Sequence, residues 1–404
     1  MTAGCLFGIY SCNSDLTDNT DGKYAEPIEL TLKQAEKVSA DNRFSFEMFR
    51  EISTLRDKPN TFFSPLSLNF ALGMLYNGAS GETRTEMAEV LGMGDFTEIE
   101  INEYYQKMSQ ALLKIDPKTD ISIANSIWLR NGFPVKQPFI DVNKNYFDAA
   151  VQSLDFNKPD AVDIINKWCY DKTKKRIPEI LKSIDGNMCL INALYFKSQW
   201  SSDTKFDKAN TKPGDFTKAD LSVINVNLME QTNRFLYYAD ENLQCIELPY
   251  GNLAYRMVVI LGDHSMSIDR LLDYLDDATW QNIIDYSMFR GQKVWLKLPR
   301  FKIECDMDLA EPVMNVGMKR IFQGGFANIS DADLAVSKIK QKTFVEVNEE
   351  GAEAAAVTLI GRDGALYEPN EPFQFFADRP FLYLIRERST GAILFIGRMD
   401  EPKE

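Results

Sequence analysis

One uninterrupted run of the chain carries two incompatible structural signals; it spans residues 342–359 and reads KTFVEVNEEGAEAAAVTL. Its first part, residues 344–347, alternates apolar and charged side chains, which predicts a half-buried strand. The part that follows, residues 349–356, has little β-propensity and favours a helix everywhere except at Gly351.

Two interpretations of this run are open on local grounds. In the first, a strand is followed by a glycine turn and a short exposed helix. In the second, Gly351 is a hinge, because glycine accepts almost any backbone dihedral angle. The small residues after it can then slide between two strands without a steric clash, so the segment is a spare strand held outside a sheet. The rest of the chain decides between them.

Length and charge limit the possible functions. The chain has 404 residues, of which 45% are hydrophobic, enough for a large core. It has 45 Lys and Arg against 59 Asp and Glu, a net charge of −14. The most basic stretch, residues 172–176, is typical of a solvated helix end. Since phosphate binding needs clustered positive charge, we expect no nucleic-acid partner.

Cysteine and histidine usage argues against a metal site or a disulfide scaffold. The six cysteines form no CxxC pair and the chain has one histidine, so we expect no metal and no cofactor. Four cysteines lie in apolar-rich segments and are expected to be buried free thiols: Cys169, Cys189, Cys245 and Cys305. No stretch of about 20 apolar residues, the length that spans a bilayer, occurs.

The first residues differ from the rest. A short apolar run ends at Cys12 and is followed by an acidic tract, residues 13–21. This resembles the end of a bacterial lipoprotein signal with Cys12 lipidated, although no positively charged segment precedes it. Cys5 follows small residues, as such a site requires, and so fits that rule better, but it lies too close to the start. We expect residues 1–27 to be a signal, a lipid-anchored tether or a disordered tail. The protein is then exported, either as a cell-surface lipoprotein or secreted.

From residue 28 to 404 we expect one domain, since no linker or internal repeat interrupts it. A first helix is predicted over residues 31–55, and Ser64 followed by Pro65 marks the start of an apolar helix. Thr83 and Glu86 have the spacing of a capping box. Strand-like runs are predicted at residues 121–129, 188–200, 226–229, 244–248, 257–261, 294–303, 343–347, 373–376, 381–386 and 392–396. Helices come early and strands late, which predicts an α+β fold.

An enzyme would need reactive groups that the sequence does not offer. His264, the one histidine, lies in a turn-like segment, so a hydrolase would have to place it beside a Ser or Cys. The nucleophile-elbow, zinc-protease, phosphate-loop and dinucleotide motifs are missing. The adjacent carboxylates at 276–277 and 349–350 are interpreted as solvated charge. We therefore expect no enzymatic activity.

Six separated motifs resemble those of the serpin family of protease inhibitors, in the family's order. They are NTFFSPLS at 60–67, LYNGASGET at 75–83, ANSIW at 124–128, NALYFKSQW at 192–200, FVEVNEEG at 344–351, and ADRPFL at 377–382 with FIGR at 395–398. The match runs from about residue 43 to 400.

The resemblance implies an α+β serpin fold with three β-sheets, about nine helices and an exposed reactive-centre loop at about residues 351–372. It also implies a monomeric suicide substrate. A target serine protease attacks the loop and forms an acyl-enzyme, and the cleaved loop then inserts into the main sheet as a new strand.

The hinge after Gly351 separates inhibitory from non-inhibitory relatives. Inhibitory members keep small residues there, as this chain does at Ala352, Ala354, Ala355 and Ala356. The alternative is a non-inhibitory serpin that acts as a binding module. At the family's hinge ion pair, Glu349 is expected to bind Arg300.

The resemblance also implies a gate that controls opening of the sheet. Its expected residues are Ser64, Ser67, Asn192, Trp200 and Gln341. Inhibitory relatives often carry His where Gln341 stands. Glutamine donates and accepts hydrogen bonds but does not titrate, so the gate is expected to lack a pH switch.

Family loops are normally cut fourteen residues after the hinge glycine, which implies a reactive bond at Ala365-Leu366. A small residue there favours an elastase-like or subtilisin-like serine protease. The alternative bond is Arg362-Asp363, which would suit a trypsin-like protease.

Overall fold

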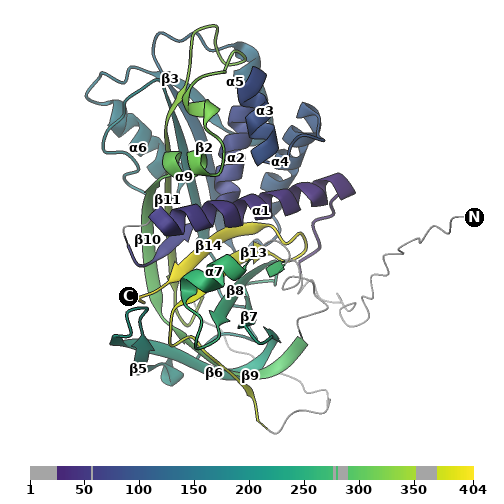
Figure 1. The fold of residues 1–404 in the computed structure, drawn as a ribbon, viewed down its shortest axis with the longest axis vertical. Helices are drawn as coiled ribbons and strands as arrows, with labels where there is room; N and C mark the ends of the chain where they lie inside the picture. Colours follow the sequence, from purple (N-terminus) through teal and green to yellow (C-terminus); the bar gives the residue numbers. More distant parts are fainter. Residues whose placement is uncertain (1–24, 56–57, 276–278, 281–289, 352–370) are drawn as a thin grey trace, which may run out of the picture.

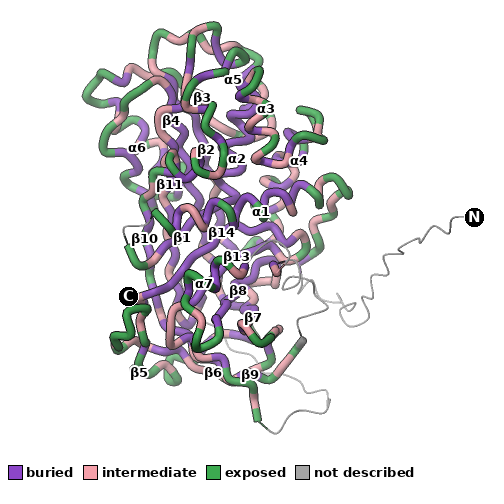
Figure 2. Tube along the Cα trace, in the orientation of Figure 1, coloured by how far each residue is buried: buried purple, intermediate pink, exposed green. Residues whose placement is uncertain are grey.

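A computed structural model of the chain describes residues 25–55, 58–275, 279–280, 290–351 and 371–404. The two sheets overlap and pack against each other in the middle of the molecule, and helices α2 to α6 gather around the smaller sheet in the upper part of Figure 1. Helix α1 crosses the middle, and most of the larger sheet lies below it. In Figure 2 the central strands are buried along most of their length.

Eight α-helices lie within the described residues. They are α1 (Leu32–Leu55), α2 (Pro65–Tyr76), α3 (Gly81–Val90), α4 (Glu98–Leu112), α5 (Gln137–Phe147), α6 (Ala161–Lys172), α7 (Ile268–Tyr274) and α9 (Ala310–Asn315).

The smaller sheet has five strands. Their order is β10 (Phe301–Asp308), β11 (Val336–Val347), β4 (Met188–Lys197), β2 (Asp120–Arg130) and β3 (Ala150–Leu154). β11 pairs with β10 in antiparallel and with β4 in parallel orientation. β4 and β2 are antiparallel.

The larger sheet has nine strands. The main path runs β1 (Thr61–Phe63), β14 (Ile393–Met399), β13 (Phe381–Glu387), β8 (Tyr255–Gly262), β7 (Leu243–Pro249), β6 (Val223–Ala239), β9 (Arg290–Pro299) and β12 (Phe373–Phe376), and β5 (Lys212–Thr217) pairs with β6.

The mixed α+β fold is confirmed, but the strands of the described residues form two sheets, one fewer than the three expected. The reason is β6, which has 17 residues. Its residues 236–239 pair with β7, while residues 228–237 pair with β9. One long strand therefore joins two groups of strands that would otherwise be separate sheets.

The predicted start of α2 is confirmed and places this helix under the smaller sheet. The Ser64 hydroxyl accepts a hydrogen bond from the Ser67 backbone N–H at 3.3 Å, and Pro65 occupies the first turn. Every residue of α2 is buried, as expected for a helix that is apolar on all sides. It contacts β2, β4 and β14.

Two local predictions are wrong. Thr83 and Glu86 form no capping box, because the Thr83 hydroxyl donates to the Gly324 carbonyl and Glu86 accepts from the Arg320 N–H. The predicted single strand over 294–303 is two strands in different sheets. The chain changes sheets at Arg300, directly after Pro299, whose missing N–H interrupts a ladder.

The packed chain includes part of the segment that we expected to be a tail. The Ala25 N–H donates to the Asn252 carbonyl, and the Arg388 side chain donates to the Ala25 carbonyl, both at 3.0 Å. Ala25 itself is buried. Within the described residues, none of the helices combines the length and the hydropathy needed to cross a bilayer.

The prediction of buried free thiols is confirmed for all four described cysteines. Burial raises the pKa of Cys169 and of Cys189 to about 12, and that of Cys305 to about 11. These thiols are therefore protonated at neutral pH.

The packing of β13 against β14 makes a testable prediction. A Cβ at Gly397 would lie 2.3 Å from Cζ of Tyr383, a fully buried ring that cannot move aside. Gly397→Ala should lower the free energy of unfolding by about 1–3 kcal/mol through overpacking. Gly94→Ala is the matched control, because a Cβ there has no neighbour within 4 Å. Equal urea midpoints for the two variants would contradict this packing.

Candidate functional site: the seam between two parallel strands

β11 and β4 meet along a parallel seam with one closed end and one open end. Their pairing runs from Val336 with Met188 to Phe344 with Tyr195. Beyond that pair, β11 continues to Val347 and β4 to Lys197. The two strands thus part before the chain leaves β11.

Trp200 occupies the open end. Its indole N–H donates to the Asn348 carbonyl at 2.9 Å, and its backbone N–H donates to the Glu350 carbonyl at 3.0 Å. The indole ring stacks on Tyr250 with 4.5 Å between ring centroids. Trp200 therefore ties the chain that leaves β11 back to the end of β4.

Gly351 lies against the same segment, and no other residue type fits there. Its φ is +119°, a conformation that residues with a Cβ rarely adopt. A Cβ would also lie 2.5 Å from the Ser198 carbonyl oxygen and 2.6 Å from the Trp200 nitrogen. Gly351 therefore reverses the chain in close contact with the end of β4.

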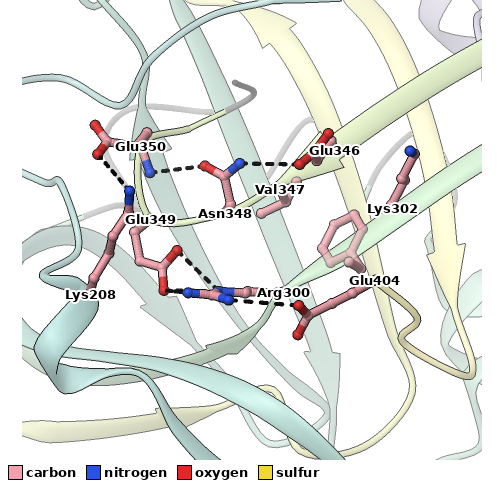
Figure 3. A pocket seen from close by; sticks show the side chains of 10 residues that line it. Lys208, Arg300, Lys302, Glu346, Val347, Asn348, Glu349, Glu350 and Glu404 are labelled. Carbon is pink, nitrogen blue, oxygen red and sulfur yellow. Dashed lines mark hydrogen bonds and ion pairs between the residues drawn. The ribbon is translucent and has the colours of Figure 1, made fainter. Parts of the chain in front are cut away.

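The predicted ion pair between Glu349 and Arg300 is present (Figure 3). The Arg300 Nε donates to both carboxylate oxygens, at 2.9 and 3.0 Å, and its Nη2 makes a further bond. The Thr211 hydroxyl also donates to this carboxylate. Burial disfavours the charge of Glu349, but the bonds from Arg300 and Thr211 outweigh it and hold the pKa of Glu349 below its usual value.

Glu350 is not the solvated charge that the sequence suggested. Its side chain is 15% exposed, and its carboxylate lies 3.6 Å from the Lys205 ammonium and 3.4 Å from that of Lys208. Both carboxylates of the pair are thus held by basic side chains. They line a surface pocket of about 270 Å³ at the open end, together with Glu346, Asn348 and Glu404 (Figure 3).

Four of the five expected gate residues lie together, and one does not. Ser64, Ser67, Asn192 and Gln341 form a buried hydrogen-bonded group where α2 meets the seam. Trp200 lies apart from this group, at the open end beside Asn348. The motif that contains both Asn192 and Trp200 extends past the end of β4, so its two ends reach different parts of the seam.

Gln341 is the centre of this group. Its amide NH₂ donates to the Ser64 carbonyl at 2.9 Å and to Asn192 Oδ1 at 2.7 Å. Its side-chain oxygen accepts from the Ser64 N–H at 2.8 Å. Gln341 and Asn192 are also register partners across the seam. The bond between their side chains must therefore break when the seam opens.

Sequence reasoning missed Asn125, which completes the buried group. Asn125 on β2 is the register partner of Asn192, and its Oδ1 accepts from Asn192 Nδ2 at 3.0 Å. Each of the three strands thus carries one amide in the same row. Only in β4 is this amide isolated among apolar residues, so the sequence of β2 gave no comparable signal for Asn125.

The remaining predicted residues lie outside the described ones. They are the hinge residues Ala352, Ala354, Ala355 and Ala356, the candidate bonds Arg362-Asp363 and Ala365-Leu366, and Cys12. The described chain stops at Gly351, beside the smaller sheet, and resumes before β12, the last strand on the path of the larger sheet.

His264 lies exposed in a turn, as predicted. Ser265, the neighbouring hydroxyl, donates to Asp263 at 2.7 Å. This arrangement is an ordinary turn contact.

Comparison with known proteins agrees with this geometry. The family model described as "Serpin (serine protease inhibitor)" matches residues 39–402. Iripin-3 of Ixodes ricinus is 36% identical over 356 residues, which cover 84% of this chain and 88% of Iripin-3. The chain belongs to the serpin family.

Two solved structures show the same fold. The thermophilic serpin tengpin, crystallised in its native state, superposes with a TM-score of 0.82 at 30% identity and covers 94% of this chain and 97% of its own. Human thyroxine-binding globulin, crystallised in complex with thyroxine, also gives a TM-score of 0.82. The sequence identity is 24%, over 92% of this chain and 100% of that protein, so this comparison supports the shared fold and nothing further.

The lowered pKa of Glu349 makes stability depend on pH. Because the folded-state pKa lies below the ordinary value of 4.5, the ion pair stabilises the fold above that pH, and this contribution is lost as the pH falls through the folded-state pKa. Glu349→Gln should cost about 2 kcal/mol of unfolding free energy at neutral pH.

The measurement is urea unfolding of both proteins across the acid range. The difference between them should shrink below pH 4.5. Glu346→Gln is the control. It also replaces a carboxylate by an amide, at a position on β11, and should leave the unfolding free energy nearly unchanged. A difference that stays constant with pH would show that the Arg300 pair is not the cause.

Proposed function

We propose that this chain is an inhibitory serpin that traps a serine protease as a covalent acyl complex. One observation carries the proposal. The chain leaves β11 at the open end of the seam and reverses at Gly351, so the residues that follow would run antiparallel to β11. Because β4 is parallel to β11, a strand entering the seam would be antiparallel to both neighbours, which is the more stable pairing.

The length of the loop fits the seam. β11 has 12 residues. Residues 352–365 are two residues longer than this strand, whereas residues 352–362 are one residue shorter. Cleavage after Ala365 would therefore release enough chain to pair along all of β11. This supports Ala365-Leu366 as the reactive bond and Arg362-Asp363 as the alternative.

The magnitudes are sufficient for inhibition. About a dozen new ladder hydrogen bonds at roughly 1 kcal/mol each supply on the order of 10 kcal/mol for insertion. Displacing a catalytic group of the protease by about 1 Å costs on the order of 100-fold in rate. Insertion therefore disables the protease provided that it is faster than deacylation.

Residue size at the reactive bond supports the choice of target. Ala365 suits an elastase-like or subtilisin-like serine protease, whereas Arg362 would suit a trypsin-like one. In this proposal the chain is an inhibitor and no enzyme, works as a monomer, and is exported. Lipidation of Cys12 would hold it at a membrane surface, and its acidic charge gives it no affinity for nucleic acid.

A non-inhibitory binding role is the second candidate. The likeness to thyroxine-binding globulin shows that this fold also occurs in a protein crystallised with a small ligand. The row of alanines after Gly351 argues against that role here. A binding module has no need for small residues that fit into a sheet.

The direct test is incubation with an elastase-like protease and, in parallel, with trypsin, followed by denaturing electrophoresis. We expect a band that contains inhibitor and elastase-like protease joined covalently. Mass spectrometry of the released fragment should show Leu366 as its first residue; Asp363 would assign the alternative bond. Cleavage without a complex at every enzyme ratio would refute trapping.

A substitution in the hinge tests insertion itself. Ala354→Arg places a long charged side chain on a residue that must enter the sheet, so it should convert the inhibitor into a substrate, with complex formation reduced at least tenfold. Glu353→Arg is the matched control, because residue 353 alternates to the opposite, solvent-facing side. If the Ala354→Arg protein still forms the complex efficiently, the mechanism proposed here is wrong.

A further inference from the structure

Three strands of the larger sheet present a cluster of aromatic and charged side chains to solvent. β6 and β9 lie at the lower end of the molecule in Figure 1, and β12 pairs with β9. Along β9, Val294, Leu296 and Leu298 are buried, whereas Trp295 and Lys297 between them are partly exposed. Successive side chains of a strand thus alternate between the core and the solvent, as expected.

The solvent side of these three strands is called here the outer face. The strand register places six side chains of interest on it, namely Glu230 and Arg234 of β6, Lys293, Trp295 and Lys297 of β9, and Phe376 of β12. Each of the three strands therefore contributes to one continuous surface.

Trp295 is held in place by its neighbours on both sides. Its indole N–H donates to the Glu230 carboxylate at 2.7 Å. On the other side, the Phe376 ring meets the indole edge to face, with 4.9 Å between ring centroids and 84° between the ring planes. Because its orientation is already fixed, a partner that covers Trp295 would pay little for ordering this large side chain.

Lys297 holds its charge over the two rings. Its ammonium lies 4.9 Å from the centroid of Trp295 and 4.8 Å from that of Phe376, within the range of a cation–π contact. The Glu230 carboxylate is 4.0 Å away, and the Lys297 side chain is 28% exposed. Since an ammonium carries three donors, Lys297 can bind a further carboxylate without leaving the rings.

The charge of the outer face is opposite to that of the whole chain. Arg234 and Lys293 are exposed register partners on the same side of the sheet as Lys297. With Glu230, the outer face has three basic side chains and one acidic one, whereas the chain has a net charge of −14. A partner with surface carboxylates would be attracted here and repelled by the chain as a whole, which would orient its approach.

The outer face also lies close along the chain to the expected reactive bond. β12 begins at Phe373, seven residues after Leu366. Seven residues span at most about 25 Å. A globular protease domain of roughly 200 residues is on the order of 40 Å across. A protease bound at Ala365-Leu366 is therefore large enough to reach past the start of β12 to Phe376 and Trp295.

We propose that the outer face is a second contact surface for the target protease and favours proteases with carboxylates beside the active-site cleft. The inference rests on the proposed function in taking Ala365-Leu366 as the bond that the protease attacks. Trp295 supplies a pre-ordered apolar contact, and Lys297 binds a carboxylate of the protease. The contact acts on docking, before the loop is cut, and leaves the later insertion step unchanged.

The test uses the full-length protein and two elastase-like proteases, one acidic and one basic around its active-site cleft. The second-order rate of loop consumption is measured on denaturing gels, counting cleaved chain and covalent complex together. With the acidic protease, Lys297→Glu should lower this rate about tenfold and Trp295→Ala about 3- to 10-fold. With the basic protease, Lys297→Glu should leave the rate unchanged or raise it.

Lys33→Glu is the matched control. The Lys33 ammonium also lies over a ring, 5.4 Å from the centroid of Phe96, and also pairs with a glutamate, Glu100, at 2.9 Å. Lys33 is on α1, outside the three strands of the outer face. This variant should stay within about twofold of the wild type. Added salt should slow consumption of the wild type by the acidic protease and have less effect on Lys297→Glu.

The outcomes separate this inference from the proposed function. Equal rates with the acidic protease for wild type, Lys297→Glu and Lys33→Glu would overturn the inference. An unchanged rate with a smaller fraction of complex would also overturn it, because the effect would then follow docking. A tenfold slower rate in Lys297→Glu, with all protein cleaved and none in complex, would support the contact and reject trapping. Urea unfolding of the variants checks that lost stability is not the cause.

Discussion

The parallel contact between β4 and β11 is the interaction on which the rest of the molecule depends. The two strands are far apart in the sequence, and each is anchored by its antiparallel neighbour, β2 or β10. A parallel pair is somewhat less stable per residue than an antiparallel one. The centre of the smaller sheet is thus a weaker line than the antiparallel pairs on either side of it, β10 with β11 and β4 with β2.

Three groups of contacts hold that line closed, and they lie at different places. The Gln341 group spans it on the side of α2. The segment that joins α6 to β4, residues 173–187, spans it on the opposite face, where the Lys342 ammonium donates to the Glu179 carbonyl. At the open end, Trp200 and the paired carboxylates at 349 and 350 hold the chain that leaves β11. Each group consists of polar bonds, which are directional and can be broken one after another. An apolar interface would have to separate as a whole.

Local signals predicted the elements well and their assembly less well. Ser64 and Pro65 predicted the start of α2 because capping is a property of neighbouring residues. The strand break at Arg300 was missed although Pro299 signalled it, and the joining of two sheets through β6 depends on pairing that no local pattern encodes. The Arg300–Glu349 pair came from the family resemblance. The position of Asn125 beside Asn192 depends on the strand register. The lysine partners of Glu350 depend on which loops, distant in the sequence, lie side by side in the fold.

The central claim is that the seam accepts the cleaved loop as a sixth strand. It is tested most directly by thermal unfolding before and after a single cut between residues 352 and 370, with hydrogen exchange measured on β4 and β11. Insertion predicts that the cut protein melts on the order of 20 °C higher, since about 10 kcal/mol of new pairing is gained. It also predicts that amides along both strands become more protected. A cut protein with an unchanged or lower melting temperature and unchanged exchange would contradict the account.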